Sequence, residues 1–169
     1  MANNCDYNMR VRGTKENVYE FHKRMRDYDS PNHLFGMFDA DIYDEFQNED
    51  GTTTVDICGQ CAWSIESCCR ASGYSNGVDL FEVNTRELGL KLECWSNEEG
   101  MCFQEHYLYD NGECQISDSV DWHVYCFDES EQTFEEFLKS CGVKNKTKED
   151  LQDDLLYVGG FKDYDEFRI

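Results

Sequence analysis

Cys58 and Cys61 have the C-x-x-C spacing that can chelate zinc or exchange a disulfide. A structural zinc site usually draws further ligands from a second C-x-x-C pair, whereas the next cysteines, Cys68 and Cys69, are adjacent. Residues three apart in a strand also point to opposite faces of a sheet. We therefore expect no bound metal or cofactor and ten reduced thiols, mostly buried. A turn at Gly59 would restore chelation, and a helix beginning nearby would keep a redox pair open as an alternative.

Carboxylates could also bind a cation or act as an acid and a base. The pairs Asp39/Asp41 and Glu98/Glu99 could hold a divalent ion, but neighbouring carboxylates arise by chance in a chain with 36 acidic residues. No carboxylate stands out as a catalytic base, and the short phosphate-binding, dinucleotide, hydrolase and zinc-protease motifs are absent. We therefore predict a protein that is not an enzyme. The alternative is a small-ligand- or metal-binding domain that uses the region 58–69.

Charge is distributed unevenly along the 169 residues, whose formal net charge is −21. Residues 35–134 contain 22 acidic and 3 basic residues, a net charge of −19, whereas residues 1–34 and 135–169 carry +1 and −3. Such a field repels phosphate backbones and anionic membranes and attracts basic surfaces. Direct binding of DNA or RNA is therefore disfavoured, because that affinity depends on Lys and Arg meeting phosphates.

The acidic excess is the strongest functional signal in the sequence. Because this charge adds self-repulsion to the folded state, we interpret it as a surface that binds a basic partner. The alternative is a protein that tolerates the charge without using it for binding. Duplex DNA carries a charge every ~1.7 Å, so this excess matches the phosphates of roughly ten base pairs. We predict that the chain mimics nucleic acid and occupies a nucleic-acid-binding site of another protein. The expected contact residues are Asp39, Asp41, Asp44, Glu45, Glu49, Asp50, Glu98, Glu99, Asp118, Asp121, Asp128, Glu129 and Glu131.

Length and hydrophobic content predict one folded domain in the cytoplasm. Aromatic residues make up 14% of the chain, which is unlike a disordered acidic chain, and 169 residues can bury a core. The chain contains no apolar run long enough to span a membrane, and its first residues lack the apolar core of a signal peptide.

Hydrophobic periodicity predicts an α+β fold with one antiparallel sheet and helices packed on one face. Residues 1–127 should form the core and residues 128–169 a C-terminal extension of two helices. Strands are expected at 5–12, 34–46, 52–61, 90–95, 101–109 and 113–127, and helices at 14–28, 64–71, 84–87, 133–141 and 147–156. Buried side chains should include Met9, Val11, Phe21, Ile57, Val120, Trp122 and Val124.

Two stretches carry a family resemblance. They are "MANNCDYNMRVRGTKENVYEFHKRM" and "LGLKLECWSNEEGMCFQEHYLYDNGE", which contains an E-x-G-M-x-F segment between two expected strands. Together with "CAWSIES", they resemble the YubB ferredoxin-like domain family over most of residues 1–127. The resemblance implies a ferredoxin-like core and an origin in phages or other mobile elements, and it carries over no catalytic residue. The composition also resembles small acidic inhibitors of bacterial defence, such as anti-CRISPR and anti-restriction proteins, which implies a partner such as a CRISPR effector in the bacterial cytoplasm.

Overall fold

The computed structural model describes residues 3–27, 39–70 and 77–169. Its strands are β1 (Asn4–Gly13), β2 (Asp41–Gln47), β3 (Thr53–Ala62), β4 (Lys91–Glu98), β5 (Phe103–Asp110), β6 (Glu113–Cys126) and β7 (Leu155–Gly159). Its helices are α1 (Lys15–Arg26), α2 (Ile65–Cys69), α3 (Leu80–Leu88) and α4 (Phe134–Cys141), with a 3-10 turn at Lys148–Asp150. The part of the expected second strand that falls at 34–38 lies outside the described residues.

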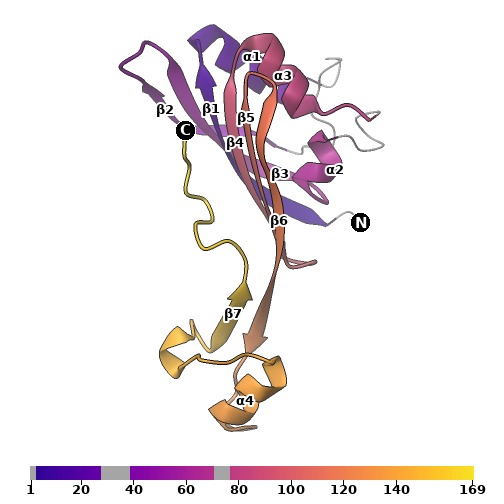
Figure 1. Ribbon diagram of the computed structural model, residues 1–169, viewed down its shortest axis with the longest axis vertical. Helices are drawn as coiled ribbons and strands as arrows, with labels where there is room; N and C mark the ends of the chain where they lie inside the picture. Colours follow the sequence, from indigo (N-terminus) through magenta and orange to yellow (C-terminus); the bar gives the residue numbers. More distant parts are fainter. Residues whose placement is uncertain (1–2, 28–38, 71–76) are drawn as a thin grey trace.

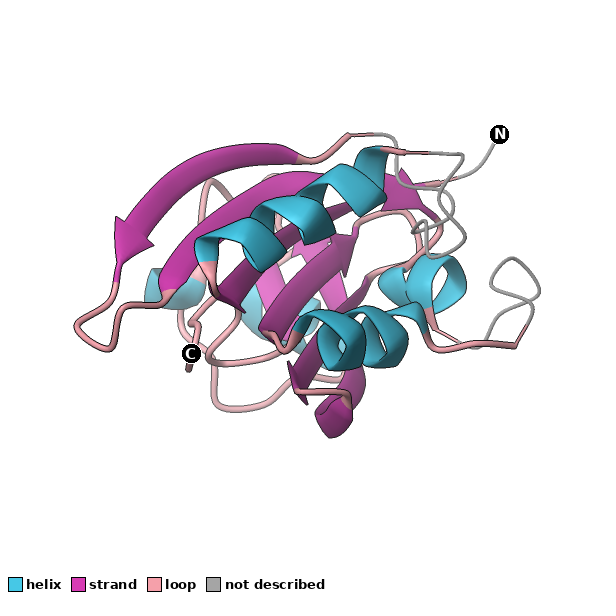
Figure 2. Ribbon diagram, turned by 90° about the horizontal axis from the view of Figure 1, so that it is seen from above, coloured by secondary structure: helices cyan, strands magenta, loops and turns pink. Residues whose placement is uncertain are grey.

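One antiparallel sheet organises the molecule, with the strand order β2-β3-β1-β4-β5-β6-β7. Helices α1, α2 and α3 cover one face of this sheet, whereas α4 lies beyond it, at the far end of β6 (Figure 1). Helices α1 and α3 lie side by side on that face when the molecule is seen from above (Figure 2). The predicted α+β class is therefore confirmed, and the sheet is larger than that of a ferredoxin fold.

The main core lies between the sheet and these three helices. Alternate residues of β1 point into it, and Met9 and Val11 are fully buried there, as the period-2 pattern predicts. Phe21 of α1 and Ile57 of β3 are also fully buried, which confirms their predicted places. Helix α1 begins at the predicted position, because the Thr14 side chain accepts a hydrogen bond from the Asn17 backbone amide.

The helix expected at residues 84–87 is longer and begins earlier than predicted. Asp79 caps the first turn of α3 by accepting from the Glu82 amide, so Asn84 is a helix-interior residue rather than a cap. Asn84 is buried and donates to the Leu80 carbonyl. The predicted end is confirmed, because Gly89 adopts the left-handed conformation that commonly closes a helix.

The predicted burial of the second half of β6 is wrong. Val124 is 41% exposed, and Val120 and Trp122 are only half-buried. Pairing with β5 places Val120 opposite Gln104, on the face of the sheet that the three helices do not cover. From Trp122 onward, β6 extends beyond β5 and pairs with β7 instead. The side chains of this part of the strand therefore no longer pack against the main core. One periodic pattern thus extends over two different environments.

The predicted second C-terminal helix, residues 147–156, is also wrong. Only the 3-10 turn at Lys148–Asp150 forms there, and the chain then enters β7. Leu156 of β7 is fully buried against Phe127 and Phe137 of a separate small core. The overhanging half of β6 offers unpaired backbone groups, and pairing them as a sheet satisfies more donors and acceptors than an isolated helix would. We call residues 122–159 the C-terminal lobe.

Candidate functional site

The structure distributes the predicted contact acids over four separate parts of the chain. Asp39 to Asp50 lie just before β2, on it and in the following turn, at one edge of the sheet. Glu98 and Glu99 lie at the β4–β5 turn, and Asp118 and Asp121 lie on β6. The remaining three, Asp128, Glu129 and Glu131, precede α4 in the C-terminal lobe, at the far end of the molecule from β2 (Figure 1). One flat partner surface could therefore contact only a subset of these acids.

Glu98 is not available as a contact residue, which corrects its predicted role. Its side chain is 2% exposed, and it accepts hydrogen bonds from the backbone amides of Gly100 and Met101. These amides belong to the turn that joins β4 to β5, where they have no strand partner. The carboxylate thus stabilises a tight turn, whereas its neighbour Glu99 remains exposed.

Three other predicted acids have intramolecular cations as partners, of which Glu129 lies 3.6 Å from Lys148 in an exposed pair. Glu45 forms an ion pair with Lys15 at 2.8 Å, and Asp50 forms one with Arg12 at 2.7 Å. The hydrogen bonds from Lys15 and then from Tyr19 hold the pKa of Glu45 below its usual value. The carboxylates of Glu45 and Asp50 are already compensated, so they contribute less to the field at the sheet edge than the sequence suggests.

Strand β2 combines uncompensated acid with exposed aromatic surface. We define the β2 edge as Asp41, Tyr43, Asp44 and Phe46. All four residues are exposed, Tyr43 at 55% and Phe46 at 38%, and neither aspartate has an ion pair within the described residues. β2 ends the strand order, so its outer backbone groups have no strand partner in this part of the chain. A register shift between Ile42 and Asp44 leaves Tyr43 as the extra residue of a bulge.

The register shows how the β2 edge is arranged. Asp41 lies opposite Cys58 and Asp44 opposite Asp56, two residues apart on β3, so the two aspartates point to the same face of the sheet. The rise of a strand places such carboxylates about 6.6 Å apart. The guanidinium of Arg10 lies 5.5 Å from the ring centre of Phe46 and holds it on this face. The edge therefore presents two spaced negative charges beside two aromatic rings.

Asp50 gives a specific prediction for the response to acid. Hydrogen bonds from the Thr52 hydroxyl and amide, with a further bond from Arg12, lower its pKa to about 2. Because the folded-state value lies below the ordinary 3.8, these bonds stabilise the fold fully above about pH 4 and lose effect as the pH falls through 2. An NMR titration of the side-chain carboxyl should give a midpoint near 2, and Thr52→Val should raise it. An unchanged midpoint in that variant would contradict this assignment.

The thiol pair that suggested metal or redox chemistry is divided by the sheet. Cys61 is buried in the main core, on the face of the sheet that the helices cover. Cys58 lies on the opposite face and is half-buried. The prediction that the two point to opposite faces is confirmed. Thiol contacts with Cys5 and Cys68, together with burial, raise the pKa of Cys61 well above its usual range. In the part of the chain that the structure describes, no three ligand-type side chains are placed to hold a metal ion.

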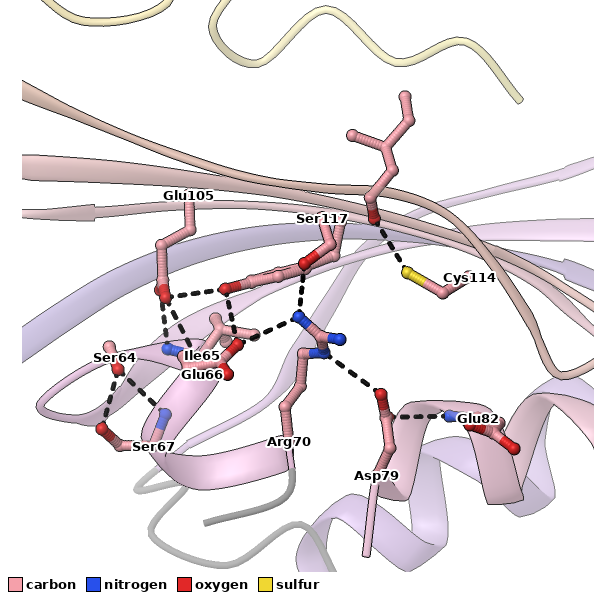
Figure 3. A network of polar contacts seen from close by, with 12 residues as sticks. Ser64, Ile65, Glu66, Ser67, Arg70, Asp79, Glu82, Glu105, Cys114 and Ser117 are labelled. Carbon is pink, nitrogen blue, oxygen red and sulfur yellow. Dashed lines mark hydrogen bonds and ion pairs between the residues drawn. The ribbon is translucent and has the colours of Figure 1, made fainter.

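A buried carboxylate that the sequence did not single out joins α2 to the sheet (Figure 3). Glu105 of β5 accepts from the amides of Ile65 and Glu66, at 2.8 and 3.2 Å, at the beginning of α2. It also accepts from the hydroxyls of Ser96 and Tyr107 at 2.7 and 2.9 Å. Its side chain is 2% exposed, so these four donors replace the water that an ionised carboxylate needs. Its position within a hairpin rich in acidic residues gave no indication of this.

Arg70 continues this network along the helical face (Figure 3). Its guanidinium pairs with Glu66 at 3.0 Å and with Asp79 at 3.1 Å, and it donates to the Ser117 hydroxyl. It also lies over the Tyr107 ring, 4.9 Å from the ring centre. Arg70 thereby joins α2 to Asp79 at the start of α3 and to Ser117 of β6. We therefore assign it a structural role.

A second buried cluster lies on the opposite face of the sheet, under residues 161–169. The Glu93 carboxylate is fully buried, and its Oε1 lies 2.8 Å from the Nε2 of His106. The His106 ring stacks on Trp95 at 3.5 Å. Glu93 and Trp95 are two residues apart on β4 and therefore share this face of the sheet. None of these groups is open to solvent, so the cluster does not form an accessible catalytic site.

The comparisons with known proteins add no function by similarity. No family model, no curated protein and no solved structure matches the chain. None of the helices among the described residues is long and apolar enough to cross a membrane. The candidate functional surface therefore rests on the geometry and charge of the β2 edge.

Proposed function

We propose that the chain is a binding protein that attaches its β2 edge to the nucleic-acid-binding surface of a basic protein and thereby excludes nucleic acid. The observation that carries this proposal is the exposed pair Asp41 and Asp44 beside the exposed rings of Tyr43 and Phe46. Interfaces are enriched in aromatic residues, and acidic groups beside them select a basic partner. A folded sheet holds these groups in place at little additional entropic cost.

The spacing of the charges favours mimicry of nucleic acid over nonspecific attraction. Same-face residues of a strand lie about 6.6 Å apart. Phosphates of one DNA strand rise 3.4 Å per nucleotide along the axis, so the separation of carboxylates on one face of β2 equals the axial rise of about two nucleotides. The net charge of −19 on residues 35–134 adds a long-range field that guides a basic partner toward this edge.

The fold supports a finer proposal, which is a ferredoxin-like core for strands β1 to β4. The element order β1-α1-β2-β3-α2-α3-β4 follows the β-α-β-β-α-β pattern, with two short helices in the second helical position. The strand order β4-β1-β3-β2 keeps every neighbour antiparallel. Strands β5, β6 and β7 would then extend this core. The resemblance to the YubB domain family belongs to the same proposal.

The biological setting that this proposal implies is the cytoplasm of a bacterium. Both the YubB resemblance and the acidic composition favour a phage or mobile-element inhibitor of a defence system, of the anti-CRISPR kind. The partner would be a nucleic-acid-handling protein, for example a CRISPR effector. Inhibition would come from occupying its nucleic-acid site, so the chain itself needs no catalytic group.

Affinity capture tests the proposal and isolates the partner in one experiment. The immobilised protein and an Asp41→Lys/Asp44→Lys variant should be incubated with nuclease-treated bacterial lysate, and bound proteins should be eluted with increasing salt. We expect the unaltered protein to retain a basic protein that binds DNA or RNA after elution, and the variant to lose it. Equal retention by both, or retention only of proteins that do not bind nucleic acid, would contradict the proposal.

A further inference from the structure

Residues 161–169, "FKDYDEFRI", lie along the sheet face opposite α1, α2 and α3 (Figure 1). They contain no helix or strand. Their three aromatic residues, Phe161, Tyr164 and Phe167, recur at every third position with charged residues between them. A turn at 162–165 lies between the rings: the Glu166 amide donates to the Asp163 carbonyl, and Asp165 has a positive φ of 66°. The segment binds the face of its own sheet through these three rings.

The rings of the segment contact specific partners on that face. Phe161 and Tyr164 meet the Trp95 ring edge to face, with ring centres 5.2 and 5.7 Å apart. The guanidinium of Arg10 lies 4.7 Å from the centre of the Phe167 ring. Aromatic pairs of this geometry attract each other beyond the effect of the apolar area that they bury. The contacts thus run along the segment from β4 to β1.

Polar contacts fix the register of the segment. The Oε2 atom of Glu93 accepts from the amides of Arg168 and Ile169 at 2.6 and 3.2 Å. The Nδ2 of Asn8 donates to both carboxylate oxygens of Asp165, at 2.9 and 3.0 Å. Without the segment, the fully buried Glu93 would keep His106 and lose both amide donors. Leaving the face would therefore exchange two charge-assisted hydrogen bonds for bonds to water and expose the Trp95 ring.

A two-glycine joint connects the segment to the C-terminal lobe. Gly159 and Gly160 both have positive φ, +89° and +75°. Glycine reaches other backbone conformations from here at low cost, so the segment can leave in a new direction without strain in the lobe. The amide of Gly160 is bonded to the Asp121 carbonyl, so the joint begins directly at the edge of β6. The lobe and the main core can each keep their own contacts while the segment moves.

We propose that residues 161–169 are exchangeable, and that the face beneath them also accepts the same segment of a second copy. Two copies would then form a dimer in which each chain covers Glu93 and Trp95 of the other. Every contact named above is reproduced in such a dimer, so the enthalpic cost of the exchange is confined to the joint. The ratio of dimer to monomer then depends on protein concentration. The repulsion between two chains of net charge −21 opposes the exchange, so salt should favour it. This inference does not depend on the function of the β2 edge.

Mixed-isotope cross-linking tests the exchange on the full chain. Unlabelled and 15N-labelled protein should be unfolded together, refolded at high concentration in high salt, and separated by size. An amine-to-carboxyl cross-linker then joins the exposed Lys162 to neighbouring carboxylates. Mass spectrometry identifies whether each of the two linked peptides is labelled or unlabelled. We expect a dimer in which links between Lys162 and the sheet join chains of different isotope in about half of the cases, as random pairing of the two pools requires.

Two variants separate this dimer from other forms of association. Deletion of residues 161–169 removes the segment that is exchanged and should reduce the dimer fraction at least tenfold. Lys139→Ala, which changes an exposed residue of α4, should not change it. The proposal is overturned if co-refolded protein is entirely monomeric. It is equally overturned if the dimer shows only same-isotope links at Lys162, because that dimer would use another surface.

Discussion

Glu105→Ala should lower the free energy of unfolding by about 3 kcal/mol or more, because it leaves three donors without this acceptor, each costing roughly 1–3 kcal/mol. These donors are the amides of Ile65 and Glu66 and the hydroxyl of Ser96, whereas the Tyr107 hydroxyl also has Glu66 as an acceptor. Helix α2 has only five residues, so it depends on this carboxylate at its first turn for its position on the sheet. Urea unfolding followed by far-UV circular dichroism would measure the change.

Two matched variants show whether the effect comes from the donors. Glu105→Gln keeps one acceptor oxygen and should be destabilised less than the alanine variant. Glu113→Ala removes an exposed carboxylate from the neighbouring strand β6 and should change the free energy of unfolding by no more than about 0.5 kcal/mol. If Glu105→Ala unfolds at the same urea concentration as Glu113→Ala, the network in Figure 3 does not hold α2 in place.

Reversing the charge of the β2 edge should have the largest effect on binding. Exposed ion pairs contribute about 0–1 kcal/mol each, so Asp41→Ala or Asp44→Ala alone should be nearly silent. The double reversal Asp41→Lys/Asp44→Lys places like charges against a basic surface, which costs several kcal/mol, and should weaken binding at least a hundredfold. Titration calorimetry or surface plasmon resonance with the captured partner would measure it.

A distant reversal provides the control for net charge. Glu113→Lys/Glu135→Lys changes the net charge by the same amount at two exposed positions, on β6 and α4. It should reduce the association rate modestly and leave the dissociation rate unchanged. Added salt should weaken the unaltered complex, because exposed charges are screened over ~8 Å at physiological ionic strength. Equal losses for the two reversals would mean that only net charge matters, not the β2 edge.

Local patterns predicted the parts of the fold that depend on neighbouring residues. The alternation of β1, the caps Thr14, Ser64 and Thr133, and the glycine ends of α3 and α4 all depend on residues within one or two turns, and all are confirmed. The errors arose where distant segments decide the outcome. Val124 is exposed because β6 extends beyond its neighbour, and residues 155–159 form a strand because that overhang offers a partner.

The charges of the candidate site were visible in the sequence, but their environments were not. Glu98, Glu93 and Glu105 look like further members of an acidic hairpin, yet all three are buried and accept two or more hydrogen bonds. Composition counts a buried, fully bonded carboxylate and a free one alike. Only the register of β2 on β3 identified Asp41 and Asp44 as an exposed pair on one face.

A competition experiment tests the central claim most directly. The captured partner should be saturated with fluorescently labelled DNA or RNA, and the protein should be added while fluorescence anisotropy follows the bound fraction. We predict that the protein displaces the nucleic acid completely. The apparent affinity of the partner for the protein should fall as the concentration of nucleic acid is raised. The Asp41→Lys/Asp44→Lys variant should fail to displace it. Formation of a ternary complex, with both ligands bound at undiminished affinity, would contradict nucleic-acid mimicry.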